Sequence, residues 1–115
     1  AMDYATFLQM YLNGGELNGV RILSRTTIDT INAFQVEMND STHYGLAFGV
    51  INEKAVSKGG LGSAGTFAWG GYFNSSYFVD PKEKILAVIL KQTRGQKNDK
   101  TGWQFKQLVF QSIDD

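Results

Sequence analysis

Hydrophobic residues at the start of the chain recur at spacings of three and four, which predicts an amphipathic helix over residues 3–13. Asp3 is the expected N-cap, and two glycines, Gly14 and Gly15, end the helix. The apolar stripe consists of Tyr4, Phe7, Leu8, Tyr11 and Leu12. Because ordered structure begins almost at residue 1, we expect this chain to be part of something longer.

A hairpin and a second helix follow. Asn18 and Gly19 separate residues 16–17 from residues 20–23, and this dipeptide favours a tight hairpin because both turn positions need a positive φ. Ser24 is the expected N-cap of a helix over residues 25–34, with Ile28 and Ile31 on its inner face.

Apolar runs further along predict an antiparallel sheet. Residues 35–42 are polar and are expected to form a surface connection before a first long strand at residues 44–51. Residues 66–69 and 72–79 form strand on either side of Gly70 and Gly71, either as one bent strand or as two short ones. Residues 85–90 are apolar at every position, which indicates a strand covered on both faces.

A polar loop at residues 94–102 precedes a last helix over residues 103–113, with Trp103, Leu108 or Phe110, and Ile113 facing inward. The sum is an α+β fold: an antiparallel sheet of about three long strands with helices packed against it and a small β-hairpin at the side. Residues 1–115 form a single domain.

Composition narrows the function classes. Eleven basic and eleven acidic residues cancel without a block of one sign, so we expect no nucleic-acid partner. The chain has no cysteine, which excludes a cysteine nucleophile and thiolate metal ligation. The single histidine, His43, precedes an apolar run and is expected to be a strand residue. No cofactor and no metal are implied.

Three short motifs are expected to be coincidental. Residues 60–65 match the GxGxxG pattern, but strand-like residues follow them instead of the helix that dinucleotide binding requires. The Lys-Thr-Gly triplet at residues 100–102, familiar from penicillin-recognising enzymes, lies beyond the last strand. The Tyr-x-Asn triplet at residues 11–13 places Tyr11 in a helical stripe that should be buried.

The glycine-rich stretch that contains Trp69, Gly70 and Gly71 is the main candidate for a site. Glycines inside a strand let a ligand or another backbone approach closely, so the stretch predicts a strand rim where something binds. The alternative is an ordinary glycine-rich turn with Trp69 as a core residue.

The order of elements resembles the C-terminal part of serine β-lactamase-like hydrolases, the superfamily of class C β-lactamases, esterases, D-aminopeptidases and penicillin-binding proteins. The resemblance covers nearly the whole chain and lies in segments 1–15, 19–24, 44–50, 69–71 and 79–81. It implies a partial β-lactamase/transpeptidase-like fold and a bacterial protein in the periplasm, in the cell envelope or secreted.

In esterase-like members of this superfamily a Trp-Gly-Gly triplet lies on the strand that borders the cleft. By this resemblance Trp69 would line the acyl pocket, Gly70 and Gly71 would let the substrate approach the backbone, and the Tyr72 N–H would be an oxyanion donor. The family's nucleophile, the serine of a Ser-x-x-Lys motif, and its Tyr-x-Asn motif would lie upstream of residue 1. Asn74 and Ser75 stand where many relatives have Gly-Thr.

The chain is therefore expected to be the C-terminal portion of a hydrolase of small esters, amides or peptide-like substrates, inactive without the missing N-terminal half. The alternative is a non-catalytic module that holds a small apolar ligand with Phe67, Trp69, Tyr72 and Phe73. The strand from Ile85 to Leu90 would have an unpaired edge, which predicts self-association there.

Overall fold

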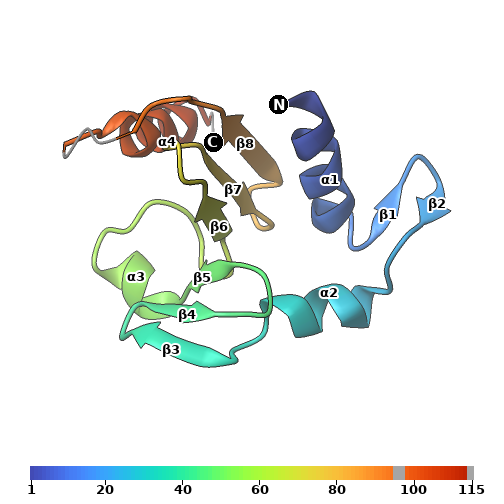
Figure 1. The fold of residues 1–115 in the computed structure, drawn as a ribbon. Coiled ribbons are helices and arrows are strands. Elements are labelled where there is room, and N and C mark those ends of the chain that lie inside the picture. Colours follow the sequence, from blue (N-terminus) through green and yellow to red (C-terminus); the bar gives the residue numbers. More distant parts are fainter. Residues whose placement is uncertain (95–97, 114–115) are drawn as a thin grey trace.

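The computed structural model describes residues 1–94 and 98–113, and it shows an α+β fold (Figure 1). Six antiparallel strands form one sheet in the order of the chain, β3-β4-β5-β6-β7-β8, and β1 and β2 form a separate two-stranded sheet. The α+β class is confirmed, and the sheet has twice the expected number of strands, most of them short. None of the described helices has the length and apolar character needed to cross a membrane.

Helix α1, Met2–Leu12, begins earlier than expected. Ala1 is its N-cap, so the prediction that Asp3 caps the helix is wrong, and this carboxylate lies in the first turn. There it still faces the positive end of the helix dipole. At the other end, the N–H of Gly15 donates to the Met10 carbonyl at 2.8 Å, and both Gly14 and Gly15 have positive φ.

The hairpin and the second helix form as predicted. Strands β1, Glu16–Leu17, and β2, Val20–Arg21, pair across Asn18 and Gly19, whose φ angles of 50° and 78° are those of the expected tight turn. Helix α2, Arg25–Asn32, starts at Ser24, whose hydroxyl accepts a hydrogen bond from the Thr27 N–H at 3.0 Å.

The predicted surface connection and first long strand are both wrong in detail. Three short strands occupy this region: β3, Val36–Asn39, β4, Thr42–Tyr44, and β5, Gly49–Ile51. The chain reverses between β4 and β5, starting at Gly45. A Cβ at this position would lie 2.1 Å from the Ile31 carbonyl oxygen, so the backbone packs directly against the end of α2 and only glycine fits there. The Gly45 N–H then donates to the Phe48 carbonyl at 2.9 Å and closes the turn.

Helix α3, Glu53–Ser57, follows β5 and leads into the glycine-rich loop. Strand β6, Phe67–Gly70, follows this loop directly, so residues 60–65 do not open a helix, as predicted. Strands β6 and β7, Ser76–Asp80, form an antiparallel hairpin, which settles the open choice in favour of two short strands. Tyr72 and Phe73 lie in the connecting turn and not in a strand.

Strand β8, Ile85–Ile89, pairs with β7 along its whole length and ends the sheet. Its two faces are covered as predicted. On one face Leu86 and Val88 pack against the core below α1, and on the other face α4, Thr101–Gln111, packs against the strand.

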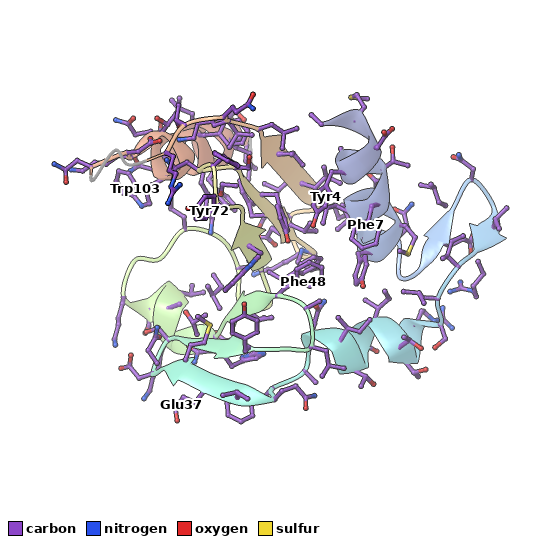
Figure 2. All side chains as sticks on the ribbon, in the orientation of Figure 1. Tyr4, Phe7, Glu37, Phe48, Tyr72 and Trp103 are labelled. Carbon is purple, nitrogen blue, oxygen red and sulfur yellow. The ribbon has the colours of Figure 1, made fainter. Side chains whose placement is uncertain are left out.

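The hydrophobic core lies between the sheet and α1. Its members are Leu8, Met10, Tyr11, Ile28, Phe48, Val50, Phe67 and Val79. Phe48 makes an edge-to-face contact with Tyr11 at 5.4 Å and lies between the sheet and the helices (Figure 2). Tyr11 is therefore a core residue, as expected, and Phe67 is also fully buried here, so its predicted role in a ligand-binding rim is wrong.

Helix α4 packs on the opposite face of the sheet through Phe110, whose ring stacks on Phe78 at 5.3 Å. Trp103 is more than half exposed, so the prediction that it faces inward is wrong. Of the two alternatives Leu108 and Phe110, Leu108 is exposed and Phe110 faces inward. Ile113 is half-buried. Lys100 is the N-cap of α4 and Thr101 and Gly102 form its first turn, so the Lys-Thr-Gly triplet is not on a strand, as predicted.

Candidate functional site

The edge of β6 is open beyond Ala68. All four residues of β6 pair with β7, but only Phe67 and Ala68 pair with β5, because β5 begins at Gly49. Among the described residues, no strand therefore lies beside Trp69 and Gly70 on this side of the sheet. The predicted rim is thus a real interruption in strand pairing.

Backbone groups at this edge point outward. The Thr66 carbonyl accepts from the Ile51 N–H, on the β5 side, whereas the Gly71 N–H donates to the Ser75 carbonyl, on the β7 side. Successive residues of an antiparallel strand address opposite neighbours, so the N–H of Gly70 faces the open edge. Tyr72 lies in the turn, where the Gly71 carbonyl accepts from the Asn74 N–H. The Tyr72 N–H belongs to the same trans peptide as this carbonyl and therefore points the opposite way, and it donates no backbone hydrogen bond to any described residue.

Trp69 lies at this edge and is 43% exposed. Its ring makes an edge-to-face contact with Tyr44 at 4.8 Å, across the place where β5 would continue. Trp69 is therefore not the core residue of the alternative interpretation. It lines two grooves, one on each face of the sheet.

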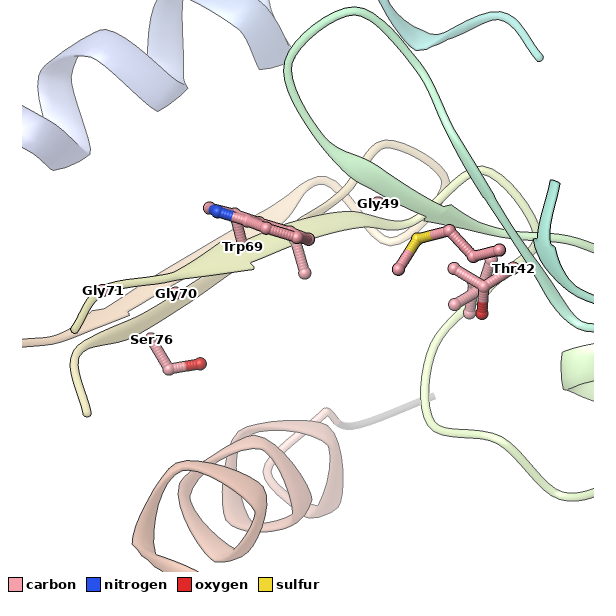
Figure 3. A pocket seen from close by; sticks show the side chains of 9 residues that line it. Thr42, Gly49, Trp69, Gly70, Gly71 and Ser76 are labelled. Carbon is pink, nitrogen blue, oxygen red and sulfur yellow. The ribbon is translucent and has the colours of Figure 1, made fainter. Parts of the chain in front are cut away.

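The larger groove, which we call the α4-side groove, has a volume of about 480 Å³ (Figure 3). Its floor is made of small residues that neighbouring strands place on one face of the sheet: Gly49, Ala68, Gly70 and Ser76. Its remaining lining is Met38, Thr42, Ile51, Trp69 and Gly71. Every lining residue is uncharged, so the groove fits a neutral, apolar ligand.

The smaller groove, which we call the α1-side groove, has a volume of about 340 Å³. It shares Trp69, Gly70 and Gly71 with the α4-side groove, and its other lining residues are Tyr4, Ser75, Tyr77 and Leu90. Burial raises the pKa of the Tyr77 hydroxyl, and the neighbouring Tyr4 adds to this effect. This phenol is therefore neutral at neutral pH and can donate a hydrogen bond, but it is not a ready base.

Tyr72, in the turn after β6, is exposed and carries the Arg94 guanidinium 4.6 Å from the centre of its ring. Its ring also contacts Phe73 edge to face at 5.2 Å. The side chain of Tyr72 thus points into solvent beside a cation, whereas its backbone N–H is the group on the open edge.

Two side chains with catalytic chemistry are held in structural roles. The Ser75 hydroxyl accepts from the Lys91 N–H and donates to the Lys91 carbonyl, both at 3.2 Å, which ties it to the backbone. His43 lies in β4, as expected, and its Nε2 contacts the Asn32 carbonyl oxygen at 3.0 Å. Because a carbonyl only accepts, Nε2 carries the proton and is not available as a base.

The four predicted site residues, Trp69, Gly70, Gly71 and Tyr72, are consecutive and lie at the end of β6 and in the turn that follows; the first three line the α4-side groove and Tyr72 does not. The structure also adds lining residues that the sequence interpretation missed, and Gly49 and Ser76 are the most informative of these. Ala68 and Gly70 could have been found from period-two alternation along β6. Gly49 could not, because its place beside Ala68 depends on strand register.

Comparison with known proteins places this geometry in context. No model of a protein family matches the chain. Two curated proteins of Mycobacterium tuberculosis, "Uncharacterized protein MT1414" of strain CDC 1551 / Oshkosh and "Protein Rv1367c" of strain ATCC 25618 / H37Rv, are each 27% identical over 106 residues. The match covers 80% of this chain and 26% of each of theirs, so the chain spans about a quarter of their length.

Among solved structures, EstCE1, described as a hydrolase with promiscuous acyltransferase activity, matches with a TM-score of 0.75 and 24% sequence identity. The match covers 94% of this chain and 29% of the EstCE1 chain. The chain therefore has the fold of part of a hydrolase.

Proposed function

We propose that this chain is the C-terminal portion of a β-lactamase-like serine hydrolase that cleaves a carboxylic ester or an amide through an acyl-enzyme. The observation that carries the proposal is the open edge of β6, where the Gly70 and Tyr72 N–H groups lie beside Trp69 and an apolar groove. A tetrahedral intermediate needs fixed donors for its oxyanion, and backbone N–H groups at a strand edge supply them without reorganisation. The likeness in fold to a hydrolase supports the reaction class.

Each predicted site residue has a role in this proposal. Trp69 lines the acyl pocket, Gly70 and Gly71 let the substrate approach the strand, and the Tyr72 N–H is one oxyanion donor. The Ser75 hydroxyl is occupied by two hydrogen bonds to the backbone of Lys91 and is not the nucleophile of this proposal. The proposal places the nucleophilic serine and its Tyr-x-Asn partner in residues outside this chain.

The test uses the complete protein that contains this chain and a short-chain nitrophenyl ester. Tyr72→Pro removes the backbone N–H, and we expect kcat to fall about 10²- to 10³-fold, the usual effect of losing one oxyanion donor. Tyr72→Phe keeps the N–H and is the matched control, expected to stay within about threefold of wild type. Because proline can disturb the turn, the circular dichroism spectrum and unfolding midpoint of both variants are compared with wild type.

Equal turnover by a well-folded Tyr72→Pro variant would overturn the role of this N–H. Replacement of the upstream serine is the second arm of the test. Unchanged ester hydrolysis after that replacement would overturn the acyl-enzyme proposal as a whole.

A non-catalytic binding module is the second candidate, favoured by the uncharged lining of the α4-side groove and by the structural roles of Ser75 and His43. Titration of the chain with small esters, followed by Trp69 fluorescence, separates the two candidates. Ligand binding without turnover in the complete protein would favour the module.

A further inference from the structure

We infer that the α4-side groove binds an unbranched apolar chain, and that Gly49 determines how deep this chain can enter. The assignment of the ligand to the acyl chain of the substrate rests on the proposed function. Binding of an apolar chain, however, can be measured without turnover.

The shape and lining of the groove favour an unbranched hydrocarbon. Its volume of about 480 Å³ lies within the range of small-molecule sites, about 300–1,000 Å³. Met38, Ile51 and Trp69 are the large apolar residues of its lining, and the floor residues are small. Trp69 and Ser76 extend from opposite faces of the sheet, so Trp69 borders the groove at the open strand edge (Figure 3). No charged residue lines the groove, so a carboxylate or an ammonium group would lose its hydration there without compensation.

Gly49 is the floor residue whose lack of a side chain is not required by the fold. Its φ is not positive, so its backbone conformation is open to any residue. A Cβ at this position would lie 3.7 Å from both the Ala68 oxygen and the Met38 Sδ, and 3.8 Å from Trp69 Cζ3. These are ordinary van der Waals distances, so the backbone can accept a side chain here.

At two other glycines, Gly45 and Gly60, the surrounding backbone leaves no room for a Cβ. A Cβ at Gly45 would clash with the Ile31 carbonyl, and one at Gly60 would lie 2.6 Å from the Ala55 carbonyl oxygen. Glycine in a strand is less favourable than alanine, because glycine loses more backbone freedom on folding. At Gly49 no close contact requires this cost, and a side chain that extends beyond Cβ would enter the space next to Met38 and Trp69.

The groove is continuous with the proposed reaction site. Gly70 lines the groove and also lies at the open strand edge, and Gly71, the next residue, lines the groove as well. An ester carbonyl at the Gly70 and Tyr72 N–H groups would therefore direct its acyl chain across Ala68 toward Gly49. This arrangement makes residue 49 a determinant of acyl-chain length.

The test measures binding of methyl octanoate and methyl acetate to the 115-residue chain by fluorescence. The protein carries Trp103→Phe, so that Trp69 is the reporter of the groove. We expect methyl octanoate to bind and methyl acetate to give no saturable change. Gly49→Leu fills the floor and displaces about two methylene groups of the ligand, so binding of methyl octanoate should weaken about tenfold.

Two further variants complete the design. Glu37→Leu adds the same side chain on β3, on the face opposite the groove, and should bind methyl octanoate like wild type. Gly49→Ala should weaken binding of methyl octanoate by less than Gly49→Leu does. It keeps the test valid if the leucine variant does not fold. Unfolding midpoints of all variants are measured beside the titrations.

Failure of the inference and failure of the proposed function give different results. Absence of octanoate binding, or equal binding by wild type and a folded Gly49→Leu variant, would overturn the inference whatever the hydrolytic activity. Gly49-dependent binding supports the groove assignment. Octanoate binding of this kind without ester hydrolysis in the complete protein would overturn only the proposed reaction.

Discussion

The carboxylate of Asp80 accepts a hydrogen bond from the backbone N–H of Ser63 at 2.7 Å and thereby joins the end of β7 to the glycine-rich loop. Its other oxygen accepts from the N–H groups of Lys82 and Glu83, at 3.0 and 3.1 Å, in the turn before β8. Asp80 is fully buried. One side chain thus holds both loops at the end of the β6–β8 sheet that lies away from the open edge.

Asp80→Asn is expected to lower the free energy of unfolding by about 2–3 kcal/mol, because one oxygen becomes an N–H₂ group that faces a buried backbone donor. Urea unfolding at pH 7 measures the change. Asp29→Asn, on the exposed face of α2, is the control and should shift the unfolding free energy by less than about 0.5 kcal/mol.

The same carboxylate predicts a pH dependence of stability. Burial opposes ionisation of Asp80, but the hydrogen bonds from Ser63, Glu83 and Lys82 outweigh it and hold the pKa of the carboxyl below its usual value. The unfolded chain therefore binds the proton more tightly. The stabilisation is present above about pH 4 and is lost as pH falls toward the folded-state pKa. The difference in free energy of unfolding between wild type and Asp80→Asn, measured by urea unfolding, should become smaller between pH 5 and pH 3. A difference that stays constant over this range would contradict this account.

Lys91 and Asp99 form an ion pair at 2.5 Å that connects the end of β8 to the start of α4. The Asp99 carboxylate also accepts from the Thr101 N–H at 2.9 Å, at the first residue of α4. Lys91→Met should lower the thermal midpoint more than Lys82→Met, on the exposed turn before β8, because it leaves Asp99 without its cation. Adding Asp99→Asn to Lys91→Met should recover part of the loss, and strictly additive effects would show that the pair is not coupled.

Gly15 and Gly19 both have positive φ, so substituting each by alanine separates the conformational cost from the cost of a steric clash. At Gly19 a Cβ would meet no atom within 4 Å, so Gly19→Ala carries only the conformational cost of about 1–2 kcal/mol. At Gly15 a Cβ would lie 2.1 Å from the Leu23 carbonyl oxygen, and the clash adds to that cost. Gly15→Ala should therefore destabilise clearly more than Gly19→Ala in chemical unfolding, and equal effects would contradict the packing of this turn.

The edge of β8 predicts self-association. Among the described residues, β8 pairs with β7 on one side and has no strand on the other, and none of its five residues is charged. Unpaired apolar edges template strand addition. Sedimentation velocity should show dimers that increase with concentration. Leu90→Lys, at the exposed residue directly after β8, should shift the population toward the 12.8 kDa monomer. A clean wild-type monomer at high concentration would overturn this prediction.

Local chemistry explains which elements could be predicted from the sequence. The helical span of α1, the Ser24 cap of α2 and the Asn18–Gly19 hairpin all depend on residues within one or two turns of each other, and each formed. The apolar stripe predicted for α1 is buried only in part, since Leu8 and Tyr11 are buried whereas Tyr4 and Phe7 are exposed. The open edge at Trp69 and Gly70 was also predicted from local sequence, since consecutive glycines after an aromatic strand mark a strand rim. The binding and catalytic roles of residues 69–72 stay a prediction.

Contacts between distant segments decided the rest. The expected long strand breaks at Gly45 because the Ile31 carbonyl of α2 lies against it, and Phe110 instead of Trp103 faces inward because Phe78 stacks on it. The α4-side groove exists only because strand register places Gly49 beside Ala68 and Ser76 beside Gly70. Sequence spacing determines which residues share a face of one strand, but the register between strands depends on tertiary packing, and that register created the groove.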